Sequence, residues 1–233
     1  MYGQDTYGNR NAVAWASENT RATFIKKTYL HLLGATLAFT MLEVFYFQSG
    51  MAQNMARAML SGSWLLVLGG FMVISWIASH FAQSAKSQAS QYFGLGLFVV
   101  AESIIFVPLL FIAMMKGGAE MINSAAQVTV VGFAALTAVA WFSRKDFSFL
   151  GVFLKWGFVV ALILIGASLL FGFNLGTLFS VAMIALAGAA ILYDTSNVLR
   201  HFPEDAYVGA ALQLFASVAL MFWYVLRLFM SRD

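Results

Sequence analysis

Long apolar runs alternate with short polar connections along most of this chain. Each run is close to the roughly 20 residues that an α-helix needs to span a hydrocarbon core. Seven such runs lie at about 27–48, 62–82, 91–115, 123–142, 150–171, 174–198 and 207–229. The pattern predicts an all-α integral membrane protein, with residues 27–233 forming a single bundle of seven transmembrane helices. We expect Pro108 to kink the third helix, because proline removes one backbone hydrogen bond.

Residues 1–26 differ from the rest of the chain. They are polar, rich in glycine and asparagine, and contain no apolar core of the kind that a signal peptide has. We interpret this stretch as a polar cytoplasmic tail that becomes helical near Trp15.

Composition supports a membrane protein that lies in the lipid bilayer. The chain is 61% hydrophobic with a mean hydropathy of +0.82, and only 10% of its residues are charged, against about 25% in an average soluble domain. A net charge of +3, dispersed along the chain, argues against nucleic acid as a partner. Without cysteine there are no thiolate sites, and the three histidines show no metal-ligand spacing.

The distribution of Lys and Arg predicts the orientation, because cytoplasmic loops carry an excess of both. With seven spans, nine basic residues fall on the side of the N-terminus and four on the other: Arg10, Arg21, Lys26, Lys27, Lys86, Arg144, Lys145, Lys155 and Arg200 against Arg57, Lys116, Arg227 and Arg232. We therefore expect a cytoplasmic N-terminus and a C-terminus outside. A re-entrant last run would instead keep the C-terminus inside.

Asp194 is the principal candidate for a functional acid within the predicted spans. It lies inside the sixth run, shortly before Arg200 and His201, and follows the small residues of 188–190, which favour close helix packing. Burial and the negative end of the helix dipole both disfavour an ionised carboxylate there, which makes Asp194 our candidate proton switch. In the alternative interpretation, the carboxylate reaches the headgroups at the interface.

Two further acids fall within the spans. Glu102 lies near the middle of the third run, where an unpaired carboxylate is most costly, so we expect it to face the bundle. It is either a structural polar clamp or part of a cation path. Glu43 lies near the outer end of the first run and is expected to snorkel toward the surface. Carboxylate oxygens are natural Ca²⁺ ligands, which makes Asp194 and Glu102 the candidate contacts for that ion.

Three classes of intramembrane protein do not fit. An aspartyl protease needs a second aspartate in a Gly-x-Gly-Asp context, and a serine protease needs a Gly-x-Ser-x-Gly elbow with a nearby histidine. Neither motif is present, and 207–229 contains no lysine that could carry retinal. We therefore predict that the chain is not an enzyme.

Four stretches resemble the Bax inhibitor-1 (TMBIM) family. The run from Ala187 to Asn197 (Ala-Gly-Ala-Ala-Ile-Leu-Tyr-Asp-Thr-Ser-Asn) resembles its sixth-helix signature. The segment 144–151 resembles the loop between its fourth and fifth helices. Ala101-Glu102-Ser103 with Pro108 is similar to its third helix, and 212–229 to its last. The last three residues, 231–233, and the sequence Asp194-Thr195-Ser196-Asn197 are most similar to the bacterial YccA-type branch of the family.

The resemblance implies a seven-helix fold whose last helix is central, surrounded by two groups of three. In leak-type members, an aspartate pair joins helices six and seven as a latch. Asp194 matches the first aspartate, whereas the second position falls at Ser217, which is not acidic. Lys86 is the candidate for the basic partner near the end of the second helix.

The resemblance also implies two functions from different classes. The first is a pH-sensitive cation (Ca²⁺) leak across the bacterial inner membrane, gated by Asp194, with Glu102 in the path. The second is a non-conducting modulator of a membrane AAA protease of the FtsH type, engaged through residues 1–26. No cofactor is implied, and Ca²⁺ enters only as a permeant ion.

Overall fold

The computed structural model describes residues 12–83, 87–143 and 145–231, and long helices dominate these ranges. A short 3₁₀ turn at Val13–Trp15 comes first. The α-helices that follow in the described ranges are α1 (Glu18–Gln48), α2 (Met51–Ser61), α3 (Trp64–Ala82), α4 (Gln88–Phe142), α5 (Leu150–Phe171), α6 (Gly176–Arg200) and α7 (Tyr207–Met230). All seven predicted apolar runs are helical, which confirms the all-α class.

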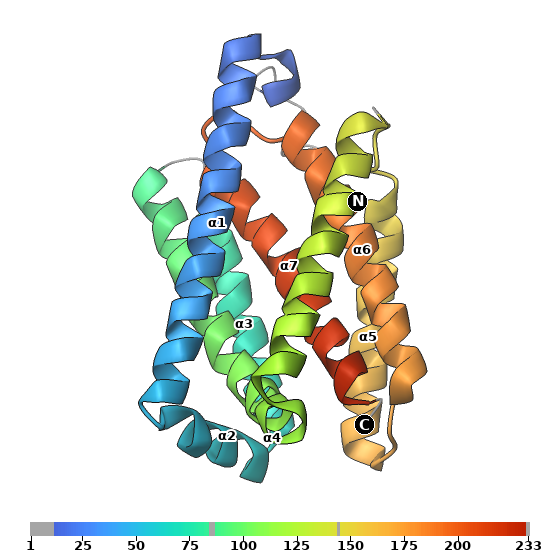
Figure 1. Cartoon of the computed structure of the whole chain (residues 1–233). Helices are drawn as coiled ribbons and strands as arrows, with labels where there is room; N and C mark the ends of the chain where they lie inside the picture. The colour runs from blue at the N-terminus through green and yellow to red at the C-terminus, as the bar shows by residue number, and fades with distance from the viewer. Residues whose placement is uncertain (1–11, 84–86, 144, 232–233) are drawn as a thin grey trace.

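The helix α2 is not one of the predicted runs. It lies in the connection after α1, at the end of the bundle (Figure 1). Ala52 and Ala56 are buried four positions apart, while Arg57 is exposed, so the helix presents one apolar face. It is too short and too polar to cross a membrane and instead resembles an interfacial helix.

The third and fourth predicted runs belong to one helical element, α4, of 55 residues. Its backbone leaves helical geometry only at Gly118, where φ is 65° and ψ is −165°. This region of backbone space is essentially limited to glycine. The two arms of α4 therefore run in opposite directions (Figure 1). A separate connection between these runs was expected, and that expectation is wrong because one glycine makes the turn. Pro108 lies inside the first arm.

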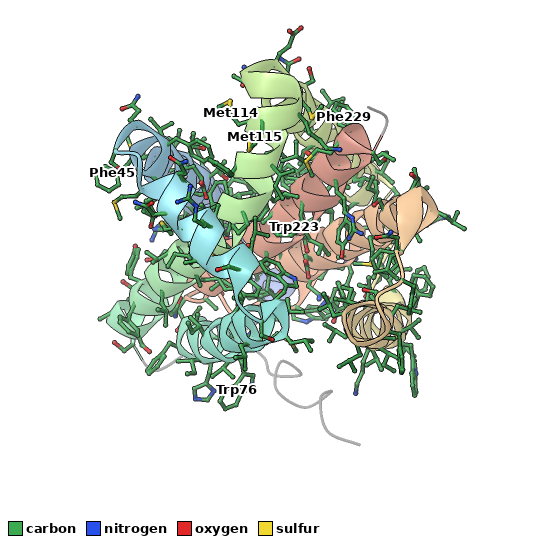
Figure 2. The ribbon with its side chains drawn as sticks, turned by 90° about the horizontal axis from the view of Figure 1, so that it is seen from below. Phe45, Trp76, Met114, Met115, Trp223 and Phe229 are labelled. Atoms are coloured by element: carbon green, nitrogen blue, oxygen red, sulfur yellow. The ribbon has the colours of Figure 1, made fainter. Side chains whose placement is uncertain are left out.

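The outer surface is strongly apolar. Six helices are long and apolar enough to cross a membrane when α4 is counted once: α1, α3, α4, α5, α6 and α7. Phe45 and Trp76, 55% and 72% exposed, project from the perimeter, whereas Trp223 lies in the interior (Figure 2). Large exposed apolar side chains over so much of a surface fit a lipid environment.

The last helix, α7, packs against α1, α3, α4 and α6, and α5 packs mainly on α6 (Figure 1). Three of the central helices meet at Ala82 of α3. A side chain on Gly94 of α4 would collide with the backbone of Ala78 and Ala82, and one on Gly209 of α7 would come within 2.6 Å of the Ala82 carbonyl oxygen. The two glycines therefore allow the backbones of α3, α4 and α7 to approach closely.

Part of the predicted tail is packed on the bundle. Ala12 forms a short antiparallel bridge with Pro203, and the Val13 backbone N–H donates to the Phe202 carbonyl at 2.9 Å. The side chain of Val13 is fully buried. The helix α1 begins at Glu18, well before the apolar run, and the Ser17 side chain caps it. Residues 1–11 of the tail lie outside the described ranges.

Candidate functional site

A cavity of about 1150 Å³ lies among α3, α4, α5, α6 and α7. Most of its lining is apolar, and two acids contribute to it: Asp194 from α6 and Glu102 from the first arm of α4. Ser217 of α7 also lines the cavity. The structure therefore brings together three of the predicted site residues, which come from three different helices.

The Ser217 hydroxyl donates a hydrogen bond to Oδ2 of Asp194, at 2.5 Å. This bond joins α6 to α7, as the position of Ser217 in the sequence led us to expect. Asp194 is 9% exposed and Ser217 is 7% exposed, so both are buried by protein atoms. The alternative in which the Asp194 carboxylate reaches the lipid headgroups does not fit this burial.

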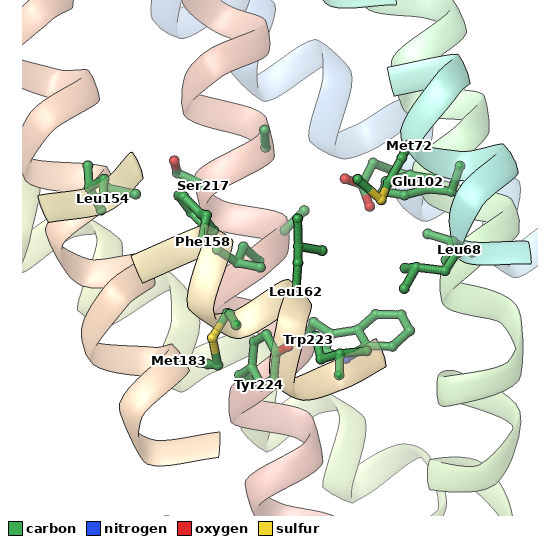
Figure 3. Close-up of a pocket in the computed structure, with 18 of the residues that line it drawn as sticks. Leu68, Met72, Glu102, Leu154, Phe158, Leu162, Met183, Ser217, Trp223 and Tyr224 are labelled. Atoms are coloured by element: carbon green, nitrogen blue, oxygen red, sulfur yellow. The ribbon is translucent and has the colours of Figure 1, made fainter. Parts of the chain in front are cut away.

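Glu102 faces the cavity from the side opposite Ser217 (Figure 3). It is 8% exposed, in agreement with its predicted position inside the bundle. Within the described part of the chain, no side chain or backbone group forms a hydrogen bond with its carboxyl. A structural clamp would need such a partner, and the described residues supply none.

Glu43 is not part of this site. It lies on α1 and lines a second cavity of about 360 Å³, with α7 between the two cavities. Its side chain is only 7% exposed, so the expectation that Glu43 snorkels to the surface is wrong. The position along a helix gives the depth of a residue, but it does not give the face on which the residue lies.

Two basic residues also line the larger cavity. From the sequence, both of them serve only to predict the orientation. Lys155 lies near the beginning of α5, and Arg227 lies near the end of α7. The Arg227 guanidinium also lies 5.9 Å from the centre of the Phe179 ring. A lysine inside an apolar run was the available sequence signal for Lys155. Lys86, the expected basic partner, lies outside the described ranges.

A polar cluster at the end of α6 holds the connection between α4 and α5. The Ser196 hydroxyl donates to Asp146 at 3.3 Å and accepts from the Phe147 backbone N–H at 3.0 Å, while His201 lies 3.6 Å from Asp146. Partial burial alone would raise the pKa of Asp146. Hydrogen bonds from Ser148 and the nearby positive charges outweigh that effect and hold the pKa below its ordinary value.

The cavity does not contain a ready-made metal site. Ca²⁺ takes six to eight oxygen ligands, whereas two separate carboxyls line this cavity. In the residues that the structure describes, no group of three or more His, Asp or Glu side chains could hold a metal ion. The donor set therefore does not fit a resident Ca²⁺ ion.

Comparison with known proteins gives the family. Residues 21–233 match the family described as "Inhibitor of apoptosis-promoting Bax1". The chain belongs to the Bax inhibitor-1 family. This confirms the resemblance found in the sequence, and it makes the chain a multi-pass membrane protein of a non-enzymatic family.

Relatives within the Bax inhibitor-1 family come from bacteria and eukaryotes. An uncharacterized protein of Campylobacter jejuni is 30% identical over 232 residues, which cover 92% of this chain and 94% of that protein. Bax inhibitor 1 of Schizosaccharomyces pombe is 28% identical over 231 residues, covering 96% and 82%. The modulator of FtsH protease YccA of Escherichia coli is 33% identical over 132 residues, covering 55% of this chain and 60% of that protein.

Proposed function

We propose that this protein is a pH-sensitive leak for cations, Ca²⁺ among them, across the bacterial inner membrane. The observation that supports this most directly is the convergence of Asp194 and Glu102 on one large cavity. Intramembrane carboxyls are costly, and they typically mark ion paths or proton relays. A second protein named "Inner membrane protein YccA", also from Escherichia coli, is the basis for the choice of membrane.

In this proposal the chain crosses the membrane seven times, around α7. Each arm of α4 makes one crossing, and α1, α3, α5, α6 and α7 make the others. Support comes from the break at Gly118, from the opposite direction of the two arms, and from the contacts of α7 with α1, α3, α4 and α6 (Figure 1). Residues 27–233 then form one domain, with a tail at its cytoplasmic end.

Asp194 is the gate in this proposal, and Ser217 holds it closed. The bond between them ties α6 to α7 at the wall of the cavity. A change in the charge of Asp194 changes its interaction both with Ser217 and with a passing cation, which is the source of the pH sensitivity. Among the residues that the structure describes, the other titratable or charged groups that line this cavity are Glu102 of α4, Lys155 of α5, Tyr193 of α6, and Tyr224 and Arg227 of α7.

The deciding experiment is ion flux into liposomes that contain only the purified protein. Ca²⁺ entry is measured with a trapped indicator between pH 5 and 8. We expect flux above that of empty liposomes, with a dependence on pH that Asp194→Asn removes. Absence of flux from correctly folded protein, or an unchanged pH profile in Asp194→Asn, would contradict the proposal.

Glu102 is tested in the same assay. Glu102→Gln keeps the size of the side chain but removes its charge, so we expect normal folding with reduced cation flux. If the folded variant conducts like the parent, Glu102 does not lie on the path.

A second function is favoured by the name of one relative. The relative named modulator of FtsH protease YccA supports the alternative that this chain acts on a membrane AAA protease of the FtsH type. In this alternative the N-terminal 26 residues engage the protease. Residues 12–26 are partly held by the bundle, so residues 1–11 are the part to remove. A modulator needs this end to control proteolysis of a membrane substrate by the reconstituted protease. A leak keeps its flux without it.

A further inference from the structure

The smaller cavity is separate from the proposed ion path. It has a volume of about 360 Å³ and lies among α1, the two arms of α4, and α7. Val218 and Phe222 of α7 line it, whereas Ser217 and Trp223 of the same helix line the larger cavity. The volume falls in the range of small-molecule sites. Ala219 lines both cavities, so one helix, α7, forms a wall of each.

Glu43 contributes an unpaired carboxyl to this space. Both of its carboxyl oxygens are buried, and neither has a hydrogen-bond partner among the described residues. The hydroxyls of Thr36, Thr40 and Thr129 also line the cavity, but each donates at 2.8–2.9 Å to the backbone carbonyl four positions earlier in its own helix. These hydroxyls are therefore already committed as donors. The Asn123 side chain also lines the cavity, but it forms no hydrogen bond with Glu43. A buried polar group without a partner is expensive, so the carboxyl can accept a donor from outside the chain.

A small cationic group would supply both a donor and a counter-charge to the Glu43 carboxylate. No lysine or arginine is among the described residues that line this cavity, so the chain itself supplies no counter-charge there. One carboxylate with a few hydroxyls is a poor set of ligands for Ca²⁺, which takes six to eight oxygens. A protonated primary amine fits better, because it has three donors and one charge on a compact head.

The residues at the entrance of the cavity indicate the chemistry of the part of the ligand that does not contact Glu43. Val44, Met114 and Val130 line the cavity and are also exposed on the outer surface, by 47%, 41% and 61%. Thr40 and Asn123 are the exposed polar residues of the same lining. The entrance is therefore mixed, and its apolar part admits an apolar chain from the lipid. Glu43 lies little more than one turn from the end of α1 at Gln48. An amphiphile can therefore reach Glu43 while its head remains near the membrane surface.

We propose that this cavity binds an amphiphile that carries a protonated primary amine on an apolar chain, with the ammonium on Glu43 and the chain against Val218 and Phe222. Two sources offer this chemistry. One is the headgroup of phosphatidylethanolamine, and the other is a free aliphatic amine.

The test is direct binding of radiolabelled dodecylamine to the full-length chain in an uncharged detergent. We expect saturable binding of one amine per chain. Glu43→Gln weakens it by about tenfold or more, because a charge-assisted hydrogen bond is lost. Glu18→Gln removes a carboxylate from the exposed beginning of the same helix and leaves binding unchanged.

Competition identifies what the site recognises. Dodecanol, which has the same chain without the charge, should displace the amine much less well than unlabelled dodecylamine does. Displacement by phosphatidylethanolamine but not by phosphatidylcholine assigns the site to the lipid headgroup. Failure of both lipids to displace the label assigns the site to a free amine.

A second variant covers the case in which Glu43→Gln does not fold. Ala126 lines the cavity and is half-buried, so Ala126→Leu occupies part of the space without touching the carboxyl. It should also abolish binding. Unchanged binding in either folded variant, or equal competition by dodecanol and dodecylamine, would overturn the proposal.

Discussion

At the scale of single residues, the contact between Asp194 and Ser217 differs from a pair of acids. Two carboxyls in contact repel each other and titrate as a coupled pair. A serine hydroxyl donates to an ionised carboxylate and accepts from a protonated one, so it can form a hydrogen bond with Asp194 in either protonation state. The link between α6 and α7 therefore does not depend on one protonation state.

Ser217→Asp should change the shape of the pH profile of ion flux. Because the variant brings two carboxyls into contact, we expect a single step to become two, separated by more than about one pH unit. Liposome flux measured from pH 4 to 9 distinguishes the two profiles.

Ser168→Asp is the matched control. Ser168 lines the same cavity near the end of α5, whereas Asp194 neighbours Tyr193, which contacts Gly151 near the beginning of α5. An acid at position 168 should not couple to Asp194. A folded Ser217→Asp variant that keeps the single step would mean that residues 194 and 217 are not in contact.

Asp146 offers a test of stability against pH. Its pKa is lower in the folded protein than in the unfolded chain, so it stabilises the fold above the unfolded pKa of about 3.9. That contribution is lost as the pH falls through the lower folded pKa. Asp146→Asn should therefore melt at a lower temperature than the parent at pH 6, and the difference should become smaller at pH 3.

The difference for Asp146→Asn should be small. The side chain is 44% exposed, and solvent screening keeps such pairs below about 1 kcal/mol. Thermal unfolding in detergent at the two pH values measures it. An equal melting temperature at both values would show that Asp146 does not stabilise the α4–α5 connection through its charge.

The sequence predicted some of the site and missed the rest for a physical reason. Asp194 and Glu102 could be found because an acid inside a transmembrane helix is too costly to expose to lipid and therefore faces the interior of the bundle. The family resemblance placed Ser217 opposite Asp194. Glu43 also faces the interior, although its position near a helix end had led us to expect that its carboxyl extends to the membrane surface. Only packing shows that α4 and α7 cover it.

At the scale of the helices, α4 shows how much depends on one backbone position. Gly118 adopts a conformation that other residues strongly avoid, and both arms remain helical up to it. Any residue with a Cβ there has either to strain the backbone or to change the direction of one arm.

Gly118→Ala should destabilise the protein by about 1–3 kcal/mol, which is the usual cost of such a conformation for a residue other than glycine. Gly96→Ala is the control, because Gly96 is helical, exposed, and has nothing within 4 Å of the position where a Cβ would lie. It should be neutral or slightly stabilising. Chemical denaturation in mild detergent compares the two. Equal stability of both variants would mean that the turn does not require glycine.

Most of the helical architecture could be predicted from the lengths of the apolar runs. That rule succeeds because the hydrocarbon core sets the length of a spanning helix. It fails where another cause acts. The helix α2 is stabilised by one apolar face, and the beginning of α1 by the Ser17 cap, and neither feature is an apolar run.

At the scale of the whole molecule, the two ends of the bundle differ in charge. The beginning of α1 and the end of α7 lie at opposite ends (Figure 1). Lys116 donates from its Nζ to the Met230 carbonyl at 3.1 Å, which places the turn of α4 beside the end of α7. Among the described basic residues, Arg57, Lys116 and Arg227 lie toward this end of the bundle. Six others lie toward the opposite end: Arg21, Lys26, Lys27, Lys145, Lys155 and Arg200.

We predict that the C-terminus lies outside the cytoplasm. A reporter enzyme fused after Asp233 that works only outside should be active, and one that works only in the cytoplasm should be inactive. The reverse result would contradict both the orientation and the odd number of crossings.

The small bridge between Ala12 and Pro203 gives the molecule a mechanical linkage. Any partner that pulls on the first eleven residues applies its force to this bridge and to the bond between Val13 and Phe202. The load then passes to the connection that follows α6, and so to the helix that carries Asp194. Tension on the N-terminus is therefore shared between α1, through the covalent chain, and the connection after α6, through these two contacts.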